Sequence, residues 1–346
     1  MTETTRIRKA LLVGAGNMGR VWAQMLQTSA GVKLVGWVDL RAETVARAAA
    51  DLGLHDLHLN ADLQQALATT RPDFVVDVTA PSAHNAVTLR ALDAEVPVLG
   101  EKPMADSMEH AREMVAAADR AGLLYMVSQS RRYNPGLSAM RRLILDAVGP
   151  LGILSSDFSI GAHESGHRLE ISSPLLLDMA IHAFDTARYM AGANPVSVYC
   201  EEFNPSLSWY RGNACATALF ESTGGLRYTH QGSWCSEGCH TSWDSDWRAV
   251  GPHGSARWRG GDDVPVADIV TERGGFLPVT EERRGQMIDA PSGIAGSLRE
   301  FLDALDSGKT PMGECHDNIK SLAMVFAAIE SAATGRRVSC RSWDES

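Results

Sequence analysis

The chain has 346 residues, of which 45% are hydrophobic and 21% charged, a composition that suits an ordinary globular protein with room for two domains. Its formal net charge of −10, with no compensating basic stripe, would repel a phosphate backbone, so we expect no nucleic-acid partner. No run of 18 apolar residues occurs and MTETTRIRK lacks an apolar core, so we expect no membrane span, no secretory signal and a cytoplasmic location.

The first predicted element is a short buried strand at residues 10–13, followed by glycines in the spacing G-x-G-x-x-G and by a helix over 18–29. Gly14 would permit a tight turn out of the strand, Gly16 would let a pyrophosphate approach the backbone, and Gly19 would let the helix pack closely. The helix N-terminus would offer unpaired N–H groups and a positive dipole end to the phosphates. A glycine-rich turn that binds nothing is the alternative.

A second strand is predicted over 33–38 and ends at Asp39, which lies 20 residues after Gly19. A carboxylate at this distance would accept hydrogen bonds from the adenosine ribose, which favours NAD. Arg41 is placed to stack on adenine or to pair with a 2′-phosphate, so NADP stays possible.

Helices and strands then alternate, which predicts right-handed crossovers and a parallel sheet covered on both faces. The helices are expected over 42–51, 62–68, 82–94 and 107–121, with Ser107 as a cap, and the further strands over 74–78, 96–99 and 123–127. Ligands of such sheets bind beyond the carboxyl ends of the strands. The predicted cofactor-binding residues at these ends are Gly14, Gly16, Asn17, Met18, Gly19, Asp39, Arg41, Thr79, Pro81, His84, Glu101 and Lys102. For His84, contact with the cofactor and a solvent-facing position at a helix start are equally good interpretations.

The strand at 96–99 leads into Glu101, Lys102 and Pro103. Pro103 restricts Lys102 to extended conformations and so stiffens its placement. A lysine held at the nicotinamide end of the cofactor would hydrogen-bond a substrate hydroxyl and stabilise negative charge on its oxygen. An ordinary surface lysine is the alternative.

The pattern changes after residue 130, where a helix over 136–148 and a strand over 154–160 precede a helix over 175–191. Asp178, His182 and Asp185 are spaced i, i+4 and i+7 on this helix and so share one face. His182 has a pKa suited to proton transfer near neutrality, and Asp178 would orient it or hold a substrate hydroxyl. A helix-surface ion pair is the alternative.

Metal ligation is not expected. His163 and His167 lie upstream of the helix on a predicted loop with no fixed spacing to it, while Cys235, Cys239 and His240 lack an evident fourth ligand. None of the six cysteines forms a C-x-x-C pair, so we predict reduced thiols.

Beyond residue 195 the chain predicts a mostly antiparallel sheet with strands over 196–203, 215–221, 226–234, 247–250 and 256–258. Residues 260–286 are polar and predict no clear element, and helices over 294–307 and 317–334 close the chain. Five of the eight tryptophans lie between 209 and 258, so we expect one face of this sheet to contact a partner subunit, giving a homodimer or homotetramer.

Four motifs together make the chain resemble the Gfo/Idh/MocA oxidoreductases: GAGNMG at 14–19, EKP at 101–103, LLDMAIHAFD at 176–185 and DNIKSLAMVFAAIESAATGRRV at 317–338. The resemblance covers nearly the whole chain. It implies a Rossmann domain, a C-terminal α/β domain with a large open-faced sheet, NAD(H) or NADP(H), and a sugar, cyclitol or related polyol as substrate. It also implies that Lys102, Asp178 and His182 form the catalytic group. The chain departs from the family pattern at residues 172–174 and at Ala180, where many members carry glycine, so the substrate's identity stays open.

We therefore expect an α/β protein with a dinucleotide-binding domain at 1–130 and a substrate-binding and oligomerisation domain at 131–346. The predicted activity is hydride transfer between a nicotinamide and a secondary alcohol or ketone. The alternatives are a hydrolase or lyase of the same fold that oxidises its substrate transiently, and a non-catalytic cofactor-binding sensor.

Overall fold

Apolar strands and amphipathic helices alternate in the computed structural model of the chain, which describes residues 7–163 and 166–344. The prediction that no leader precedes the first strand falls largely on residues 1–6, which lie outside this range. The chain forms two units, divided at residues 129 and 130, and residues 294–319 belong to the first unit. The sequence analysis had placed residues 294–319 in the second domain, which it expected at 131–346.

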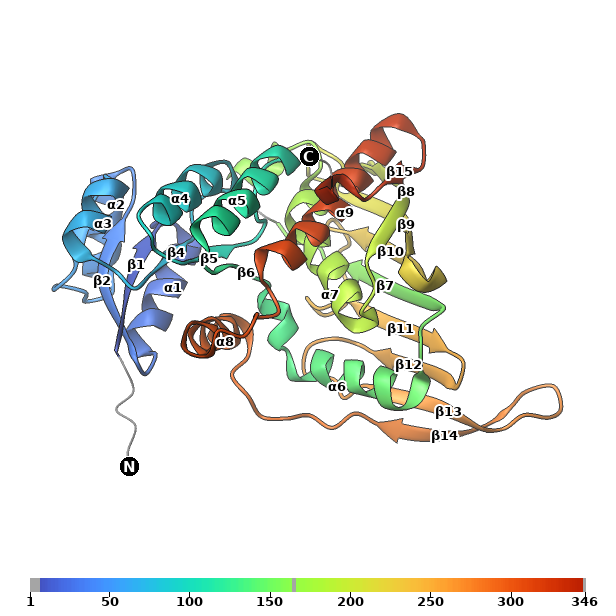
Figure 1. Cartoon of the computed structure of the whole chain (residues 1–346). Coiled ribbons are helices and arrows are strands. Elements are labelled where there is room, and N and C mark those ends of the chain that lie inside the picture. The colour runs from blue at the N-terminus through green and yellow to red at the C-terminus, as the bar shows by residue number, and fades with distance from the viewer. Residues whose placement is uncertain (1–6, 164–165, 345–346) are drawn as a thin grey trace, which may run out of the picture. The chain divides into compact units, whose positions relative to one another are not determined.

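Within the described residues, the first unit holds a parallel sheet of six strands in the order β3-β2-β1-β4-β5-β6 (Figure 1). The strands are β1 (Arg8–Val13), β2 (Val32–Val38), β3 (His58–Asn60), β4 (Phe74–Asp77), β5 (Val98–Glu101) and β6 (Tyr125–Ser128). The three-residue β3 was not predicted, because its partly exposed side chains carry no hydrophobic pattern.

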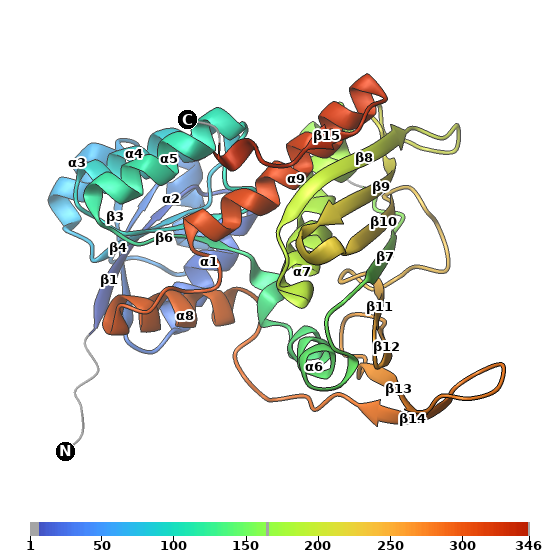
Figure 2. The same cartoon turned by 45° about the vertical axis from the view of Figure 1, so that its right-hand side comes forward.

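The helices of this unit are α1 (Asn17–Thr28), α2 (Ala42–Asp51), α3 (Leu63–Thr70), α4 (Pro81–Asp93), α5 (Met108–Ala121) and α8 (Gly293–Ser307). Figures 1 and 2 show α4 and α5 on one face of the sheet and α1 and α8 on the other. Helix α8 packs Phe301 against Phe74 of β4 with ring centroids 5.4 Å apart, and Asp306 pairs with Arg8 of β1. These contacts explain why a helix from the far end of the sequence joins the first unit.

The second unit is built on a mixed sheet that, within the described residues, has nine strands in the order β14-β13-β12-β11-β7-β10-β9-β8-β15. Only the pairing of β7 with β10 is parallel. The strands are β7 (Ile153–Ser159), β8 (Pro195–Phe203), β9 (Cys215–Ser222), β10 (Arg227–Ser233), β11 (Asp246–Gly251), β12 (Gly254–Trp258), β13 (Val266–Glu272), β14 (Val279–Arg284) and β15 (Val338–Ser339). The mostly antiparallel sheet is confirmed, and β13 and β14 fall in the segment for which no element was predicted.

Helices cover one face of this sheet, as Figures 1 and 2 show. They are α6 (Pro135–Leu143) with a π-helical extension η2 (Ile144–Val148), a π-helical turn η4 (Leu175–Ala180) that continues into α7 (Ile181–Ala191), and α9 (Cys315–Thr334), most of which belongs to this unit. Shorter 3-10 turns, η1 (Ser130–Tyr133), η3 (Gly166–Leu169), η5 (Thr223–Gly225) and η6 (Ser342–Asp344), lie between them. Along the strands buried residues alternate with exposed ones, so the other face of the sheet is open.

Three of the five tryptophans between residues 209 and 258 are buried within the second unit. Trp234, Trp247 and Trp258 are almost completely buried, and Tyr228 stacks near Trp247 with ring centroids 6.1 Å apart. These tryptophans are therefore part of the unit's own core, and the expectation that they contact a partner subunit is wrong for these three. None of the helices in the described parts of the chain is long and apolar enough to cross a membrane.

Candidate active site and cofactor-binding turn

The glycine-rich turn has two positions that the fold itself reserves for glycine. Gly14 adopts a φ of +102°, and a Cβ there would lie 2.7 Å from the Val78 carbonyl oxygen. A Cβ on Gly19 would collide with the Gly14 carbonyl oxygen, because α1 packs directly on the turn. The roles predicted for Gly14 and Gly19 are thus structural requirements of the turn.

Gly16 differs from its two neighbours in the motif. A Cβ at Gly16 would meet no atom within 4 Å, and its backbone φ of −72° suits any residue. The residue is the N-cap of α1, yet no side chain caps the helix there, and the first turn of α1 has no acidic residue. Gly16, Asn17 and Met18 are exposed. The turn therefore presents open backbone N–H groups and the space that an approaching anion needs.

Asp39 lies beside this turn, directly after β2. Its Oδ2 accepts a hydrogen bond of 2.8 Å from the backbone N–H of Ala15, and its Oδ1 accepts one of 3.0 Å from the N–H of Arg41. Both bonds hold the carboxylate next to the glycine turn. A carboxylate has about four acceptor positions, so two remain for ribose hydroxyls.

His84 belongs to a buried polar cluster at the end of β4. Its Nδ1 lies 2.9 Å from Oδ2 of Asp77, while Oδ1 of Asp77 accepts bonds from the N–H and hydroxyl of Thr79. Burial alone would lower the pKa of His84, but the Asp77 carboxylate, aided by Glu101 and Asp106, raises it above its ordinary value. His84 is only 1% exposed, so this geometry favours a supporting role over direct contact with a cofactor.

Glu101 and Lys102 follow β5 and are tied to α1. Glu101 Oε1 accepts a 2.8 Å bond from the Trp22 indole, and its Oε2 accepts a 3.1 Å bond from the N–H of Lys102. Burial raises the pKa of Glu101, and these hydrogen bonds together with the Lys102 charge lower it in part. The peptide bond between Lys102 and Pro103 is cis. Glu101 thus positions the backbone that carries Lys102.

In the second unit, Asp178 lies in the π-helical turn η4, and π-helical turns are frequent at functional sites. Its Oδ2 pairs with Nε of Arg168 at 2.7 Å, and its charge also acts on Arg131. Burial lowers the pKa of Arg131 to about 10, and Asp244 and Asp178 raise it in part. The Asp178 carboxylate is therefore paired with the Arg168 guanidinium, and the sequence pattern gave no reason to select Arg168.

His182 is the second residue of α7, and its side chain is nearly buried, with 8% of the residue exposed. Asp185 lies one turn further along α7 and is buried. Arg132 donates hydrogen bonds of 2.7 and 2.6 Å to its two carboxylate oxygens, and Ser321 of α9 donates one of 2.7 Å. Arg188 in turn donates to Ser321 at 2.8 Å. Asp185 is thus a structural anchor that joins η1, α7 and α9.

Residues 172 and 173, where the chain departs from the family pattern, are bonded to other segments of the second unit. Ser173 donates a 2.9 Å hydrogen bond to Glu202 of β8, and the Ser172 carbonyl accepts a 2.7 Å bond from the N–H of Asn213. The loop before η4 is therefore fixed by two other segments of the sheet unit.

The structure places the predicted site residues in two groups. The glycine turn, Asp39, the Thr79–His84 segment and Glu101–Lys102 all follow carboxyl ends of strands in the first unit. Asp178 and His182 belong to the second unit. That Lys102 meets Asp178 and His182 at one substrate stays a prediction.

Three of the side chains considered as metal ligands have other contacts. His163 pairs with Glu237 at 2.7 Å and stacks on Trp209, and His240 Nε2 accepts a bond from the N–H of Gly161. Cys235 lies 3.6 Å from Cys215, sulfur to sulfur. The side chain of His167 lies outside what the structure describes.

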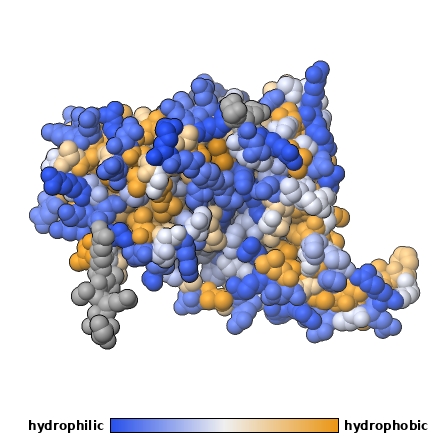
Figure 3. All heavy atoms as spheres, viewed as in Figure 1, coloured by the Kyte–Doolittle hydropathy of each residue, from blue (hydrophilic) through white to orange (hydrophobic). Residues whose placement is uncertain are grey.

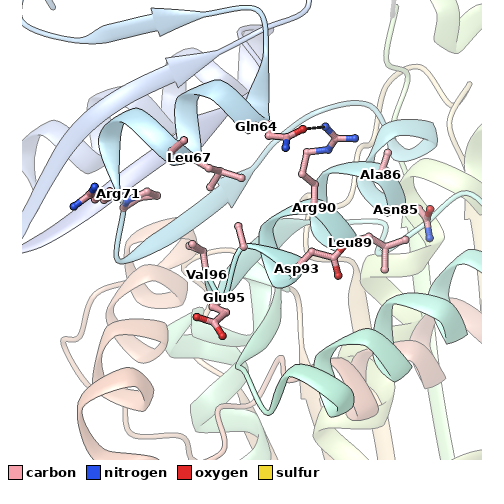
Figure 4. Close-up of a pocket in the computed structure, with 13 residues that line it drawn as sticks. Gln64, Leu67, Arg71, Asn85, Ala86, Leu89, Arg90, Asp93, Glu95 and Val96 are labelled. Carbon is pink, nitrogen blue, oxygen red and sulfur yellow. Dashed lines mark hydrogen bonds between the residues drawn. The ribbon is translucent and has the colours of Figure 1, made fainter.

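A groove of about 910 Å³ lies between α3 and α4, where Arg90 donates a 3.2 Å bond to Gln64 (Figure 4). Its lining includes Arg71 and Pro72, just before β4, and Glu95 and Val96, just before β5. It therefore extends along α4, from Asn85 and Ala86 near the start of the helix to residues just before β5, and holds none of the predicted site residues.

Known proteins match the chain in both sequence and fold. Residues 8–129 match the model of the oxidoreductase family with an NAD-binding Rossmann fold, and residues 139–257 match the GFO/IDH/MocA C-terminal domain. The scyllo-inositol 2-dehydrogenase (NAD(+)) of Bacillus subtilis is 27% identical over 96% of each chain. The D-apiose dehydrogenase of Paraburkholderia graminis is 25% identical over 99% of this chain and 92% of its own. An oxidoreductase from Agrobacterium radiobacter, solved with NAD+, L-tartaric acid and magnesium, shares the fold with a TM-score of 0.85 at 21% identity, covering 97% of this chain and 99% of its own.

The fold and these matches define the class of the protein as an NAD-binding oxidoreductase with a Rossmann domain. The chain belongs to the Gfo/Idh/MocA family. The predicted family, the two-part fold and the nicotinamide cofactor are thereby confirmed.

Proposed function

We propose that the protein transfers a hydride between NAD and a secondary alcohol or ketone of a sugar, cyclitol or related polyol. The relatives named above act on an inositol and on apiose, which supports this substrate class.

The residues of the first unit fit the cofactor. The uncapped start of α1 and the open position at Gly16 suit a pyrophosphate, and Asp39 is held where a ribose diol would bond. When bound, NAD supplies the hydride acceptor for the carbon that is oxidised. Asp39 would repel a 2′-phosphate, so we propose that NAD is preferred over NADP.

Three side chains would carry the proton chemistry. His182 would remove the hydroxyl proton as a base, and Lys102 would donate a hydrogen bond to the same oxygen and stabilise its developing negative charge. Asp178 would hold a neighbouring substrate hydroxyl or orient His182. In the reverse direction His182 would return the proton to the oxygen, with Lys102 again bonded to it.

One feature supports the placement of Lys102 most directly. Its backbone is held by Glu101, which is bonded in turn to Trp22 of the helix that starts at the glycine turn. The lysine is thus linked through two hydrogen bonds to the element that would receive the pyrophosphate. A backbone fixed in this way would hold the catalytic side chain at a constant position relative to a bound cofactor.

A spectrophotometric screen of sugars, cyclitols and sugar acids with NAD+ at about 340 nm, the absorbance of reduced nicotinamide, tests the proposal. We expect NADH to accumulate with at least one of these polyols. Substrate consumption without net NADH would favour the transiently oxidising hydrolase or lyase instead. Tight NAD binding with no turnover of any compound would favour the sensor.

The NAD preference is tested by titrating NAD and NADP into the wild type and Asp39→Ala. We expect the wild type to bind NAD more tightly and Asp39→Ala to lose about tenfold or more in NAD affinity, because hydrogen bonds to a charged group are lost. Equal or tighter NADP binding by the wild type would refute the preference.

A further inference from the structure

Three adjacent residues with metal-binding side chains lie at the start of α9: Glu314, Cys315 and His316. The ligand atoms of these three side chains all lie within 4.8 Å of one another, and no other His, Cys, Asp or Glu side chains in the described parts of the chain form such a group. Cys315 Sγ is 2.8 Å from Glu314 Oε1 and 3.5 Å from His316 Nδ1, and Oε1 and Nδ1 are 2.7 Å apart. A thiol, an imidazole and a carboxylate, the side-chain groups that bind Zn²⁺, therefore meet at one point.

The backbone holds this group against the sheet of the first unit. Glu314 forms an antiparallel bridge with Met126 of β6, and the N–H of Val127 donates a 2.8 Å bond to the Gly313 carbonyl. Figures 1 and 2 show the start of α9 beside β6. The N–H of His316 donates a 3.0 Å bond to Glu314 Oε2, while Oε1 faces the thiol and the imidazole. The three donor atoms are thus held together by the fold, which lowers the cost of binding an ion.

Asp119 of α5 fixes the orientation of the histidine ring. His316 Nε2 lies 3.1 and 3.2 Å from the two oxygens of Asp119, so this nitrogen donates to the carboxylate. A metal-bound histidine almost always donates its other ring N–H to a carboxylate, a carbonyl or water, which fixes the tautomer and raises the basicity of the ligand. Asp119 meets this requirement for a metal bound at Nδ1.

We propose that Glu314 Oε1, Cys315 Sγ and His316 Nδ1 bind one Zn²⁺, with Asp119 positioning His316 and a solvent water as the fourth ligand. The ion takes the place of two protons, one on the thiol and one on Nδ1, whose hydrogen bonds Glu314 accepts in the metal-free chain. The thiolate and the carboxylate then balance the charge of the ion. The site holds none of the residues assigned to hydride transfer, so its test does not depend on the substrate.

The size of the group suits a tetrahedral zinc site. With Zn–S at about 2.3 Å and Zn–N and Zn–O at about 2.0–2.2 Å, tetrahedral donors lie about 3.3–3.6 Å apart. The distance of 3.5 Å between Cys315 Sγ and His316 Nδ1 already has this value, and the Glu314 oxygen must withdraw by less than about 1 Å from both.

The group is also open to solvent on one side. Cys315 is buried, whereas the side chains of Glu314 and His316 are 19% and 53% exposed. Figure 3 shows mainly hydrophilic residues at the surface where α5 and the start of α9 lie in the same view. An ion can therefore enter from solvent, and a water can occupy the fourth position of the tetrahedron.

Titration of Zn²⁺ into the chelator-treated full chain, with a chromogenic chelator as competitor, tests the proposal. We expect one Zn²⁺ per chain with a dissociation constant below the micromolar range. Asp119→Asn should raise this constant about 10- to 100-fold, because the histidine loses its orienting carboxylate. Cys315→Ser and His316→Gln should raise it further, because each removes a direct ligand. With Co²⁺ as the probe, the wild type should show a thiolate-to-cobalt charge-transfer band that Cys315→Ser lacks.

Two matched controls remove similar groups elsewhere on the chain. His163→Gln removes an exposed histidine that also lies 2.7 Å from a carboxylate, and Cys239→Ser removes an exposed thiol. Both should keep the wild-type affinity and the cobalt band. Asp119 is exposed, so Asp119→Asn should keep the wild-type circular dichroism even if a ligand variant fails to fold. Absence of Zn²⁺ binding at micromolar concentration, a cobalt spectrum without the thiolate band, or unchanged Zn²⁺ affinity in folded Asp119→Asn or Cys315→Ser would overturn the proposal.

Discussion

Gly16 and Gly19 show how two residues of one motif meet different physical demands. The fold excludes a Cβ at Gly19, which faces the Gly14 carbonyl oxygen, whereas it leaves open space at Gly16. No contact of the described chain requires glycine at position 16, and the open space there is what the predicted pyrophosphate would need.

The two glycines make a matched pair of variants. Gly16→Ala should change the free energy of unfolding by less than about 1 kcal/mol, the cost of alanine at an N-cap, while raising the NAD dissociation constant about tenfold or more. Gly19→Ala should destabilise the fold by about 1–3 kcal/mol, because backbone atoms must move. Urea denaturation and calorimetric titration measure both. Unchanged NAD binding by Gly16→Ala would contradict the assigned site of the pyrophosphate.

His84 predicts a pH-dependent contribution to stability. Its pKa in the folded state is raised by Asp77, so the protonated form stabilises the fold below the unfolded pKa of about 6.5. This contribution is lost as the pH rises through the folded pKa. His84→Asn should therefore lower the free energy of unfolding more at about pH 5.5 than at about pH 9. Urea denaturation of both proteins at the two pH values measures the difference, and an equal loss at both would count against the ion pair.

At the scale of elements, a buried ion pair joins segments that are distant in sequence. Arg132 of η1 binds both oxygens of Asp185 on α7, and Ser321 of α9 binds one of them. Because Asp185 is buried, removal of the Arg132 guanidinium would leave the negative charge of Asp185 without the cation that balances it.

Arg132→Ala should lower the free energy of unfolding by about 3–5 kcal/mol. Arg299→Ala, which breaks an exposed pair with Asp303, is the matched control and should cost about 0–1 kcal/mol. Equilibrium denaturation of both variants gives the comparison. A similar small loss in each would show that Asp185 is not held as the structure describes.

Elements with a strong apolar pattern could be predicted from sequence, and those without one could not. The strand before Gly14 and the helix after it were found because their buried residues recur at the strand and helix periods. Strand β14 is fully exposed, so its position is determined by backbone pairing with β13, which leaves no mark in its side chains. The hydrogen bond between Glu101 and Trp22 could not be predicted either, because it joins residues 79 apart in sequence. The position of Glu101 at the end of a strand indicated a site residue, but no sequence pattern indicated that Trp22 binds it.

At the scale of the molecule, the C-terminal segment completes the nucleotide-binding unit. Helix α8 buries Leu298, Phe301 and Ala304, and the N–H of Val127 on β6 donates a 2.8 Å bond to the Gly313 carbonyl. The periodicity of α8 showed that the helix is amphipathic, but no sequence pattern specifies which of two sheets such a helix covers.

A fragment ending at residue 130 should therefore be unstable, with an apolar face of the sheet exposed where Phe74 loses Phe301. The same fragment joined by a flexible linker to residues 294–319 should regain a cooperative thermal transition and NAD binding. Circular dichroism melting of the two fragments makes the comparison. Equal stability of the shorter fragment would contradict the assignment of this segment to the first unit.

The most direct test of the proposed chemistry is the ratio of NADH formed to ketone formed on the substrate that the screen identifies, in the wild type and in Lys102→Ala and His182→Ala. We predict one NADH for each ketone in the wild type, with kcat lower by about 10²- to 10⁴-fold in each variant and the NAD dissociation constant nearly unchanged, because a positioned proton-transfer group is lost. Product formed without net NADH, or near-wild-type turnover by either variant, would contradict hydride transfer by this group of residues.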